Sequence, residues 1–382
     1  MAEYPTSTRA IVTTPPKDGA PTWAMQDISL RDPSPNEVLV RIVASGVCHT
    51  DLAISMVPPE YGMLFPKVMG HEGGGVVEKI GAGITHVKPG DLVLLSFDFC
   101  GADDCYNCAG EKPGFCSRFN ALNLMSEAGV YKNGAGEAVA GSFFGQSSFA
   151  NFALVKERSA LNVTGLVRSE DELKLFVPFG CGFQTGAGAV TETARVGDKD
   201  SIAVFGLGGV GMLAVIAAKI RNAKTIVAVD KVQSRLDIAK SVGATHTINT
   251  SNFADLKADL DKAIKEIVPQ GTNFNIDTTG VLPIIEAGVT SLQGGGQLIL
   301  IGIMNGLTLN VDLSDLLANG KTIRGCIEGN AKPAKFVPQL IQWYHEGKLP
   351  IEKLIKFYPA DDFEKALGDV HAGTTIKPIL TW

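Results

Sequence analysis

Four of the seven cysteines gather in one short stretch of the chain, and their spacing could hold a metal ion. They follow the pattern C-x4-C-x2-C-x7-C at Cys100, Cys105, Cys108 and Cys116. Four thiolates at such spacing can surround one ion tetrahedrally, and a site closed in this way is typical of structural zinc. Free buried thiols are the alternative, but clustered cysteines in a reducing compartment favour a metal. The pattern therefore predicts a structural zinc site that stabilises a loop.

A second group of metal-type side chains is spread along the chain. Cys48 and Asp51 are three residues apart, His71 and Glu72 stand in a glycine-rich turn, and Cys181 comes later. Taken singly, each cysteine or histidine is most simply a packed or surface residue. Core packing does not explain a polar pair in a glycine-rich turn, however, and Cys181 directly precedes the expected dinucleotide domain, where we expect it to face the crevice between domains. Three ligands with a fourth position open are typical of catalytic zinc.

A glycine-rich turn after an apolar strand indicates dinucleotide binding. The strand covers residues 201–205, and apolar helix formers follow the turn as far as residue 220. The glycines are Gly206, Gly208, Gly209 and Gly211. In this context they let the backbone approach a pyrophosphate at the helix N-terminus. An ordinary strand-to-helix turn is the alternative, but Asp230 ends the next strand about 20 residues later, where a carboxylate binds a ribose 2′-hydroxyl and repels a 2′-phosphate. We therefore expect NAD rather than NADP.

Strands and helices alternate from residue 183 onward. The pattern predicts strands over 201–205, 225–230, 274–277 and 297–303 and helices over 232–242, 253–268 and 283–292. This alternation indicates an α/β fold with a doubly wound parallel sheet. A last helix is expected over 333–345, followed by short strands. Residues 1–182 are instead β-rich, with apolar runs over 37–43, 75–80, 91–95 and 149–155 between Pro and Gly turns.

Length and composition suit a globular protein of two domains. The chain has 382 residues, of which 45% are hydrophobic and 19% charged, and its formal net charge is −6. No Lys/Arg cluster stands out, which argues against nucleic acid or an anionic membrane as a partner. The first residues lack a signal pattern, and no apolar run approaches the ~20 residues that span a bilayer. We therefore expect a cytoplasmic protein.

Together these motifs resemble one known family, the zinc-dependent medium-chain alcohol dehydrogenases. The matching stretches are CHTD (48–51), GHEGGGVVEKIG (70–81), the cysteine cluster, GCGFQTGAGAV (180–190), VFGLGGVG (204–211), DTTG (277–280) and IKPIL (376–380). The resemblance implies a GroES-like catalytic domain over 1–182, a NAD-binding Rossmann domain over 183–326 and a return to the catalytic domain over 327–382. Residues 143–149 and 327–330 look most like the aryl- or benzyl-alcohol branch of the family.

The resemblance implies a role for each member of the dispersed group. Three residues would hold a catalytic zinc ion: Cys48, His71 and Cys181. Glu72 would lie behind the metal and be able to approach it during ligand exchange. Asp51 would accept a hydrogen bond from the far nitrogen of His71 and fix its tautomer. Thr50 would be the first acceptor of the proton from the substrate alcohol.

Further residues match cofactor-binding positions of the family, in addition to the motif glycines and Asp230. They are Thr185 and Val210 beside the nicotinamide, Arg235 at the adenosine ribose, Lys377 at the pyrophosphate, His49 at a phosphate, and Ile303. Lys377 would tie the last strand of the chain to the cofactor.

Two departures from the family pattern bear on the chemistry. The usual spacing of the structural cluster is C-x2-C-x2-C-x7-C, so this chain inserts two residues between Cys100 and Cys105. The extra residues could bulge outward and leave the zinc site intact. Ala53 stands where some members carry a histidine that ends the proton relay, so the relay must end in water or at His49. Cys326 matches no ligand position and is most simply a small core residue.

We expect a reversible, zinc-assisted transfer of hydride between a primary aryl or allylic alcohol and NAD. The expected pocket lining is apolar and offers no cluster of acids or amides to a polyol: Ser96, Phe97, Phe143, Phe144 and Ile327. Two alternatives stay open. The same chemistry could act on a polyol, a secondary alcohol or a formaldehyde–thiol adduct, or the protein could bind zinc and NAD in a structural role. We also expect a homodimer or homotetramer, in which strands 297–303 and 307–311 could pair across a dimer.

Overall fold

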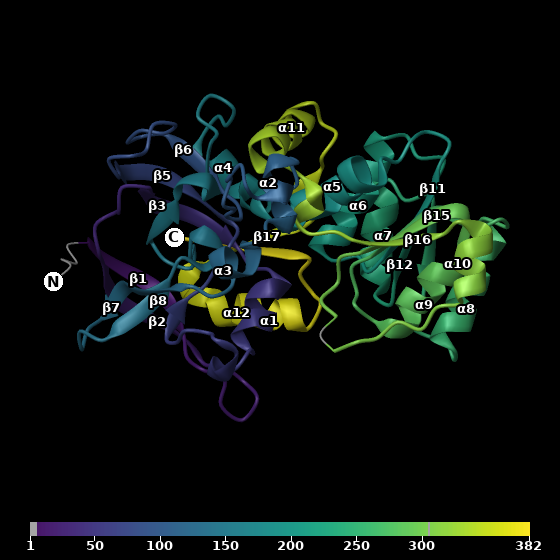
Figure 1. The fold of residues 1–382 in the computed structure, drawn as a ribbon, viewed down its shortest axis with the longest axis horizontal. Helices are drawn as coiled ribbons and strands as arrows, with labels where there is room; N and C mark the ends of the chain where they lie inside the picture. The colour runs from purple at the N-terminus through teal and green to yellow at the C-terminus, as the bar shows by residue number, and fades with distance from the viewer. Residues whose placement is uncertain (1–5, 305) are drawn as a thin grey trace. The chain divides into compact units, whose positions relative to one another are not determined.

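The computed structural model describes residues 6–304 and 306–382, which fold into two compact units (Figure 1). The first unit contains the chain up to Cys181 together with Lys332–Trp343 and Leu354–Trp382. The second contains Gly182–Ala331 and Tyr344–Lys353. The C-terminal part of the chain therefore contributes to both units.

A closed β-barrel and a larger sheet form the described part of the first unit. The barrel order is β1 (Thr6–Thr13), β2 (Trp23–Leu30), β7 (Glu127–Asn133), β8 (Ala138–Gly141) and β4 (Lys67–Val68). The sheet order is β10 (Ala160–Asn162), β6 (Leu92–Leu95), β5 (Gly73–Ile80), β3 (Glu37–Gly46), β18 (Lys377–Thr381) and β17 (Ile355–Pro359), and β9 (Phe152–Lys156) also pairs with β3. Apolar side chains from the barrel strands and from residues 143–154 fill one buried core.

Strand β3 is the centre of this sheet and carries the chain to the first predicted ligand. Nearly all of its residues are buried, as expected for a strand of apolar and β-branched residues that is covered on both faces. It pairs antiparallel with β5 and β9, and its last residues pair with β18. Cys48 follows β3, and the His71–Glu72 pair precedes β5, so the register Ser45↔Gly73 places the two ligand segments at the same end of neighbouring strands.

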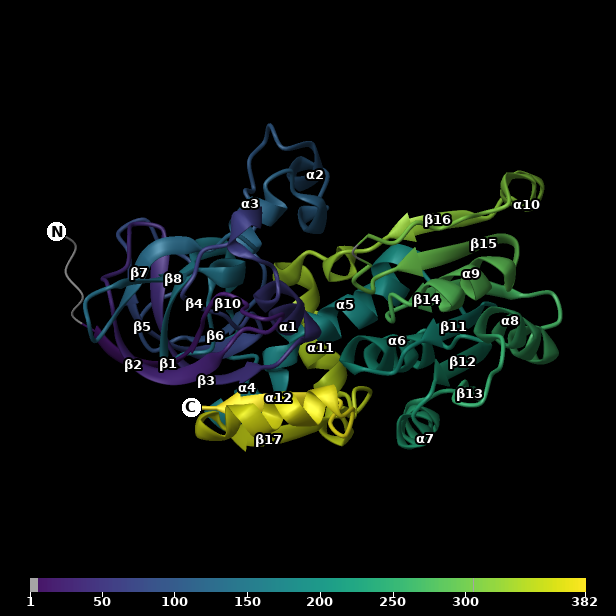
Figure 2. The same ribbon diagram turned by 90° about the horizontal axis from the view of Figure 1, so that it is seen from below.

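The helices of the first unit are short. They are α1 (His49–Ser55), α2 (Tyr106–Ala109), α3 (Phe119–Asn123), α4 (Glu170–Phe176) and α12 (Phe363–His371), and the longer α11 (Pro333–His345) belongs to this unit as far as Trp343. Figure 2 shows the segment with α2 and α3 projecting from the barrel of this unit. Among the described residues, no helix is both long enough and apolar enough to cross a membrane.

The second unit is the doubly wound sheet that the sequence predicted. Its six strands are parallel, in the order β13 (His246–Asn249), β12 (Thr225–Asp230), β11 (Ser201–Phe205), β14 (Thr272–Asp277), β15 (Leu292–Leu300) and β16 (Thr322–Gly325). Its helices are α5 (Gly182–Gly188), α6 (Gly209–Ile220), α7 (Gln233–Val242), α8 (Leu256–Ile267), α9 (Leu282–Thr290) and α10 (Leu313–Asn319). Helices α6 and α7 lie on one side of the sheet, and α8 and α9 cover the other side (Figure 1).

One strand boundary in this unit needs correction, and one predicted strand depends on a second copy of the chain. Residues 307–311 pair with no described strand of the same chain, and their pairing across a dimer stays a prediction. Strand β15 begins at Leu292, five residues earlier than predicted, since three successive glycines hid the start of an apolar pattern. The sequence also gave no sign of the π-helix over Ala189–Ala194.

A buried carboxylate fixes the start of β3. Glu37 is 2% exposed and accepts hydrogen bonds from the Arg31 guanidinium at 2.6 and 2.9 Å, from Ser34 N at 2.8 Å and from Lys156 Nζ at 2.8 Å. Burial alone would raise the pKa of Glu37, but these donors lower it to about 2. The charged form of Glu37 therefore stabilises the folded state.

We expect Glu37→Gln to destabilise the protein by about 3 kcal/mol at neutral pH, the value that corresponds to a fall in pKa from 4.5 to about 2. Because the pKa is depressed in the folded state, this stabilisation is complete above pH 4.5 and is lost as the pH falls through 2. Chemical denaturation of wild type and variant across this range measures it. Glu78→Gln is the control, because Glu78 is an exposed partner of Arg41, and we expect it to lower the free energy of unfolding by less than about 1 kcal/mol. A loss for Glu37→Gln that did not change with pH would contradict this account.

Candidate active site and metal centres

The fold gathers the predicted metal ligands into two separate clusters, both in the first unit. One contains Cys48, His71, Glu72 and Cys181, and the other contains Cys100, Cys105, Cys108 and Cys116. Within each cluster, one ligand atom of every residue lies within 4.8 Å of the others. The first cluster draws on three distant parts of the chain, so only the folded protein can form it.

Asp51 joins two of the three segments that supply the first cluster. Its side chain is fully buried, and it accepts hydrogen bonds from Cys48 N at 3.0 Å and from Gly70 N at 3.1 Å. The same carboxylate lies 2.8 Å from His71 Nδ1. Asp51 stands in the first turn of α1, which begins directly after Cys48, and its carboxylate also caps that turn. The prediction that Asp51 orients His71 therefore has the required geometry.

His71 presents an unused nitrogen to the cluster. With Nδ1 donating to the Asp51 carboxylate, the neutral imidazole that a metal ion would bind has its lone pair on Nε2, and Nε2 is buried without a hydrogen-bond partner among the described residues. Phe144 stacks on the imidazole at a centroid distance of 4.5 Å, and Phe143 meets it edge-on at 5.7 Å. A buried nitrogen lone pair beside two thiol sulfurs fits zinc, which takes nitrogen and sulfur ligands.

Glu72 is held by a buried ion pair. Lys377 Nζ contacts the two carboxylate oxygens at 2.8 and 2.7 Å and donates to Val47 O at 3.2 Å. Both side chains are almost completely buried, and a Cβ atom at Gly46 would lie 2.1 Å from Glu72 Oε2. Gly46 therefore leaves the space that the carboxylate occupies. The family resemblance implies that Lys377 lies at the cofactor pyrophosphate. In the structure its ammonium group contacts Glu72 and thereby connects β18 to the first ligand cluster.

Charge is concentrated around the first cluster. A hydrogen bond with Cys181 and the nearby charges of His71 and Lys377 hold the pKa of the Cys48 thiol well below its usual range. Burial opposes protonation of His71, but the charges of Asp51 and Cys48 raise its pKa well above the usual range. Burial raises the pKa of Glu72. Negative charge at Cys48 and Asp51 thus favours a cation at this point, which a divalent metal ion supplies.

Three further side chains surround the cluster. Thr50 Oγ1 lies 3.8 Å from Cys48 Sγ, while His49 is exposed at the start of α1. Gln146, which sequence reasoning missed, donates from Nε2 to His71 O at 3.0 Å and to Ser96 O at 3.2 Å and accepts from Gly73 N at 3.0 Å. The one signal for Gln146 was its place in an otherwise apolar or small-residue run, 143–149. It fixes the backbone on both sides of Glu72.

The four-cysteine cluster accommodates the two inserted residues. Cys100 Sγ lies 3.6 Å from Cys108 Sγ and 3.5 Å from Cys116 Sγ, near the separation of about 3.8 Å that tetrahedral Zn–S bonds of 2.3 Å would give. The inserted part of the loop, with Asp103 and Asp104, is exposed and lies outside the cluster. Burial raises the pKa of Cys108 to about 12, while hydrogen bonds from Ser117 lower that of Cys105 to about 5. The residues present fit a closed zinc site.

The parts of the glycine motif also lie together in the second unit. Helix α6 starts at Gly209, directly after the turn, and Gly206, Gly208 and Gly211 flank that start. Asp230, at the end of β12, accepts from Leu207 N at 2.7 Å and from Val232 N at 2.9 Å. Arg235 Nη1 lies 3.9 Å from Asp230 Oδ2. The carboxylate is thus connected to the turn that would hold a pyrophosphate.

Helices α5 and α6 bring two further predicted residues close together. A Cβ atom at Gly186 would lie 2.0 Å from Val210 O, so these helices touch through their backbones beside Thr185. Thr185 Oγ1 donates to Glu328 Oε2 at 3.5 Å, and Gln184 Nε2 donates to the same oxygen at 3.2 Å. Ile303 is 48% exposed. Cys326, which we interpreted as a small core residue, is 5% exposed and lies 3.5 Å from Thr193 Oγ1.

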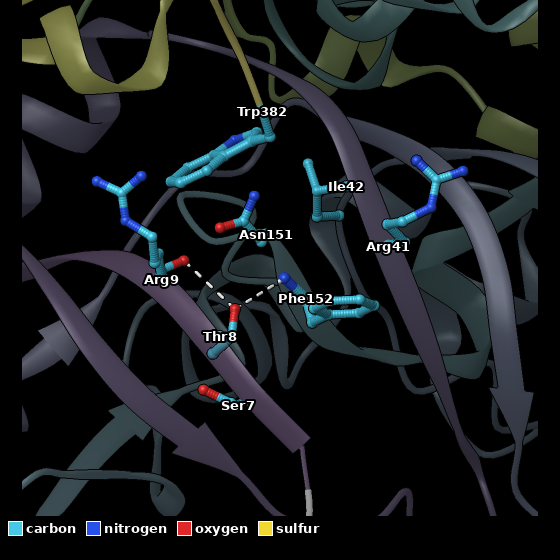
Figure 3. A pocket seen from close by; sticks show the side chains of 8 residues that line it. All are labelled: Ser7, Thr8, Arg9, Arg41, Ile42, Asn151, Phe152 and Trp382. Atoms are coloured by element: carbon cyan, nitrogen blue, oxygen red, sulfur yellow. Dashed lines mark hydrogen bonds between the residues drawn. The ribbon is translucent and has the colours of Figure 1, made fainter.

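A cavity of about 270 Å³ in the first unit has no part in either cluster (Figure 3). It is lined by Ser7, Thr8, Arg9, Arg41, Ile42, Asn151, Phe152 and Trp382. Arg9 pairs with Asp361, and Arg41 pairs with Glu78 and Glu170. Because its cations already have partners and its lining contains none of the metal ligands of the two clusters, we do not assign the reaction to this cavity.

Family models match most of the chain. Residues 34–165 match the alcohol dehydrogenase GroES-like domain, and residues 209–346 match the zinc-binding dehydrogenase domain. A geraniol dehydrogenase of Castellaniella defragrans is 35% identical over 94% of both chains. The chain belongs to the zinc-dependent medium-chain alcohol dehydrogenase family. It is accordingly a zinc-type oxidoreductase that interconverts alcohols and carbonyl compounds, and the predicted fold class is confirmed.

Two solved structures and one further sequence relative extend this comparison. The benzyl alcohol dehydrogenase of Acinetobacter calcoaceticus is 39% identical with a TM-score of 0.88, covering 98% of this chain and 99% of that one. An alcohol dehydrogenase zinc-binding domain protein from Burkholderia ambifaria is 40% identical with a TM-score of 0.91 at the same coverage. An S-(hydroxymethyl)glutathione dehydrogenase of Paracoccus denitrificans is 31% identical over 95% of this chain and 97% of that protein.

The two clusters should respond differently to the loss of one thiol. We expect Cys181→Ser to abolish turnover and remove one zinc ion per chain with little loss of stability, because the closed site does not use this thiol. Cys108→Ser should remove the other zinc ion and lower the melting temperature, because the loop around α2 has little apolar surface of its own. Metal analysis with thermal unfolding measures both effects. One zinc ion or none per chain in active wild-type enzyme would rule out the two-site assignment.

Proposed function

We propose that this dehydrogenase oxidises primary alcohols with an aryl or allylic group next to the reacting carbon, and reduces the matching aldehydes, with NAD as the preferred cofactor. The observation that supports it best is the pair of phenylalanines against the metal cluster, with Phe144 stacked on His71 and Phe143 edge-on to it. Aromatic walls at the reaction centre favour a flat, apolar group over a sugar-like chain. Geraniol and benzyl alcohol, named for two relatives, are allylic and benzylic alcohols of this kind.

The chain's own residues would position and deprotonate the alcohol. Cys48, His71 and Cys181 would hold zinc, which when bound supplies a Lewis acid that lowers the pKa of an alcohol. Thr50, beside Cys48, would accept the alcohol proton through its hydroxyl. Ala53 offers no further acceptor, so the proton would pass on to water or to His49, which is exposed. Asp51 would keep His71 in the tautomer that leaves Nε2 toward the cluster.

The second unit would hold the hydride acceptor. We propose that residues 183–326 bind the dinucleotide and that residues 1–182 and 327–382 form the catalytic domain. The pyrophosphate would lie at the N-terminus of α6, the ribose 2′-hydroxyl at Asp230, and the nicotinamide beside Thr185 and Val210. Conjugation weakens the carbinol C–H bond of an aryl or allylic alcohol, so hydride transfer needs positioning and no additional group from the protein.

A polyol or a thiol adduct of formaldehyde remains the competing substrate class. The relative from Paracoccus denitrificans is named for its activity on the hydroxymethyl adduct of glutathione. Phe97, Phe143 and Phe144 are fully or almost fully buried and present no charged group to a polar substrate. An unpaired hydroxyl of a polyol against such walls costs about 1–3 kcal/mol. The aromatic lining therefore supports the aryl or allylic assignment.

Asp230 should set the preference for NAD. We expect Asp230→Ser to raise the ratio of kcat/KM with NADP to that with NAD by roughly 10- to 100-fold, because a like charge beside the 2′-phosphate is removed. Fluorescence titration of NADH and NADPH gives the same comparison without turnover. Lys231 and Arg235 are the nearby cations. A wild-type protein that prefers NADP would show that they outweigh Asp230.

Substrate ranking tests the proposed function directly. We expect kcat/KM with NAD to be highest for benzyl, cinnamyl and geranyl alcohols, at least about tenfold lower for ethanol, and lowest for sorbitol, whose hydroxyls would lose their hydrogen bonds. Initial rates of NADH formation at several alcohol concentrations give the ranking. The hydroxymethyl adduct of glutathione is the comparison substrate for the competing class. If ethanol, sorbitol or this adduct ranked first, the assignment of aryl and allylic substrates would be wrong. The zinc-assisted oxidation of an alcohol would not be affected by that result.

A further inference from the structure

A buried carboxylate in the second unit holds two side chains of α5. Glu328 is 6% exposed and stands in the short turn Glu328–Asn330, which follows β16. One of its oxygens, Oε2, accepts a hydrogen bond from Gln184 Nε2 at 3.2 Å and a longer one from Thr185 Oγ1 at 3.5 Å. The turn and the helix belong to the same unit, although these bonds join residues 144 and 143 positions apart in the chain.

The backbone of this turn is strained. Glu328 and Asn330 have left-handed φ values of 52° and 54°, which residues other than glycine rarely adopt. Gly329 lies between them, and a Cβ atom there would be 2.7 Å from Gln184 O, so the turn presses directly against α5. Strained residues persist where the surrounding structure holds them, and they are frequent at functional sites. Because glycine would take the conformation of Glu328 without steric cost, the glutamate side chain has a role beyond the shape of the turn.

Helix α5 connects Glu328 to the proposed cofactor site. Helices α5 and α6 touch through their backbones, since a Cβ atom at Gly186 would lie 2.0 Å from Val210 O. Val210 belongs to the first turn of α6, directly after the glycine turn, and Thr185 precedes Gly186 in α5. The side chain that Glu328 holds therefore adjoins the place where the proposed function puts the nicotinamide.

The bond to Glu328 orders the side chain of Thr185. Threonine has several staggered rotamers and a single hydroxyl proton. Donation of this proton to the carboxylate selects one rotamer, so the surface that Thr185 presents is fixed before a ligand binds. A surface ordered in advance improves the affinity for the group that it holds and the geometry of the reaction, because binding then carries no further cost of ordering.

We propose that Glu328 is a positioning residue for the nicotinamide: its carboxylate orders Thr185 and Gln184, and α5 in turn supports the ring for hydride transfer. In this role Glu328 acts through α5 and not by contact with the cofactor. The inference rests on the proposed function, in which the second unit binds the dinucleotide. Loss of the carboxylate should therefore weaken binding of the nicotinamide half alone. The ADP-ribose half, at Asp230 and the start of α6, should bind as before.

The test compares NADH with ADP-ribose, which lacks the nicotinamide, by calorimetric titration of the zinc-loaded enzyme. In wild type NADH should bind more tightly, and the Kd for ADP-ribose divided by the Kd for NADH measures the contribution of the nicotinamide. Glu328→Gly should lower this ratio by roughly 3- to 10-fold, because it removes the carboxylate at a position where glycine relieves the backbone strain. Glu328→Gln, which keeps a neutral acceptor of the same shape, should give an intermediate ratio.

Arg235→Ala is the control, because Arg235 lies beside Asp230 on the adenosine side of the proposed site. It should weaken NADH and ADP-ribose by a similar factor and leave the ratio unchanged. Turnover gives a second readout. In Glu328→Gly the kcat for benzyl alcohol should fall, and the isotope effect with alcohol deuterated at the reacting carbon should rise, because hydride transfer becomes slower relative to product release.

An unchanged ratio in both Glu328 variants, whether or not they bind the two ligands more weakly, would overturn this assignment and leave the proposed function in place. If wild type bound neither ligand, the proposed binding of the dinucleotide would fail together with this inference. If it bound both but oxidised no aryl alcohol, the proposed substrate class would be wrong, and the ratio would still decide the role of Glu328. Should Glu328→Gly not fold, the ratio for Glu328→Gln takes its place.

Discussion

The active-site cluster depends on one carboxylate. Asp51 is fully buried and accepts hydrogen bonds from the backbone of Cys48, the backbone of Gly70 and the imidazole of His71. It thus sets the position of one loop relative to another and the orientation of the imidazole at the same time. A thiol and an imidazole that come from different strands can meet at one ion only if both backbones are fixed, because an error of about 1 Å is enough to spoil such a site.

Charge imposes the second constraint on this region. Thiolates at Cys48 and Cys181 next to the carboxylate of Glu72 would repel one another in a buried site without compensation. Lys377, at the start of the last strand, supplies a cation to Glu72, and Gly46 keeps the space for it free. The pairing of the C-terminal strand with β3 thus places a cation beside the cluster, in the same unit as the beginning of the chain.

Residues with a local chemical signature could be found from the sequence, and residues that act through tertiary contacts could not. Short stretches of sequence were enough to recognise the cysteine spacing, the glycine turn and the strand that ends in Asp230. The alternation of apolar runs predicted the parallel sheet. No short motif marks the role of Gln146, because this side chain bonds three backbone groups that only the fold brings together. The strand over 307–311 is a related case. Its apolar residues alternate as in a strand, but its predicted partner belongs to a second copy of the chain, so it stays a prediction.

Buried polar atoms without partners are the most informative feature that the fold adds. His71 Nε2 and Lys67 Nζ both belong to this class among the described residues, and both lie against Phe143. Membership of the family fits the first, since a zinc ion held by this cluster would accept the lone pair. The second cannot be explained in the same way, because an ammonium group has no lone pair to offer a metal. The hydroxyls of Thr13 and Tyr131 also lack partners, but a neutral hydroxyl is much cheaper to bury than an ammonium. Lys67 is therefore the costliest of these groups to bury, and the contacts of its ammonium with the rings of Phe65 and Phe143 offset part of that cost.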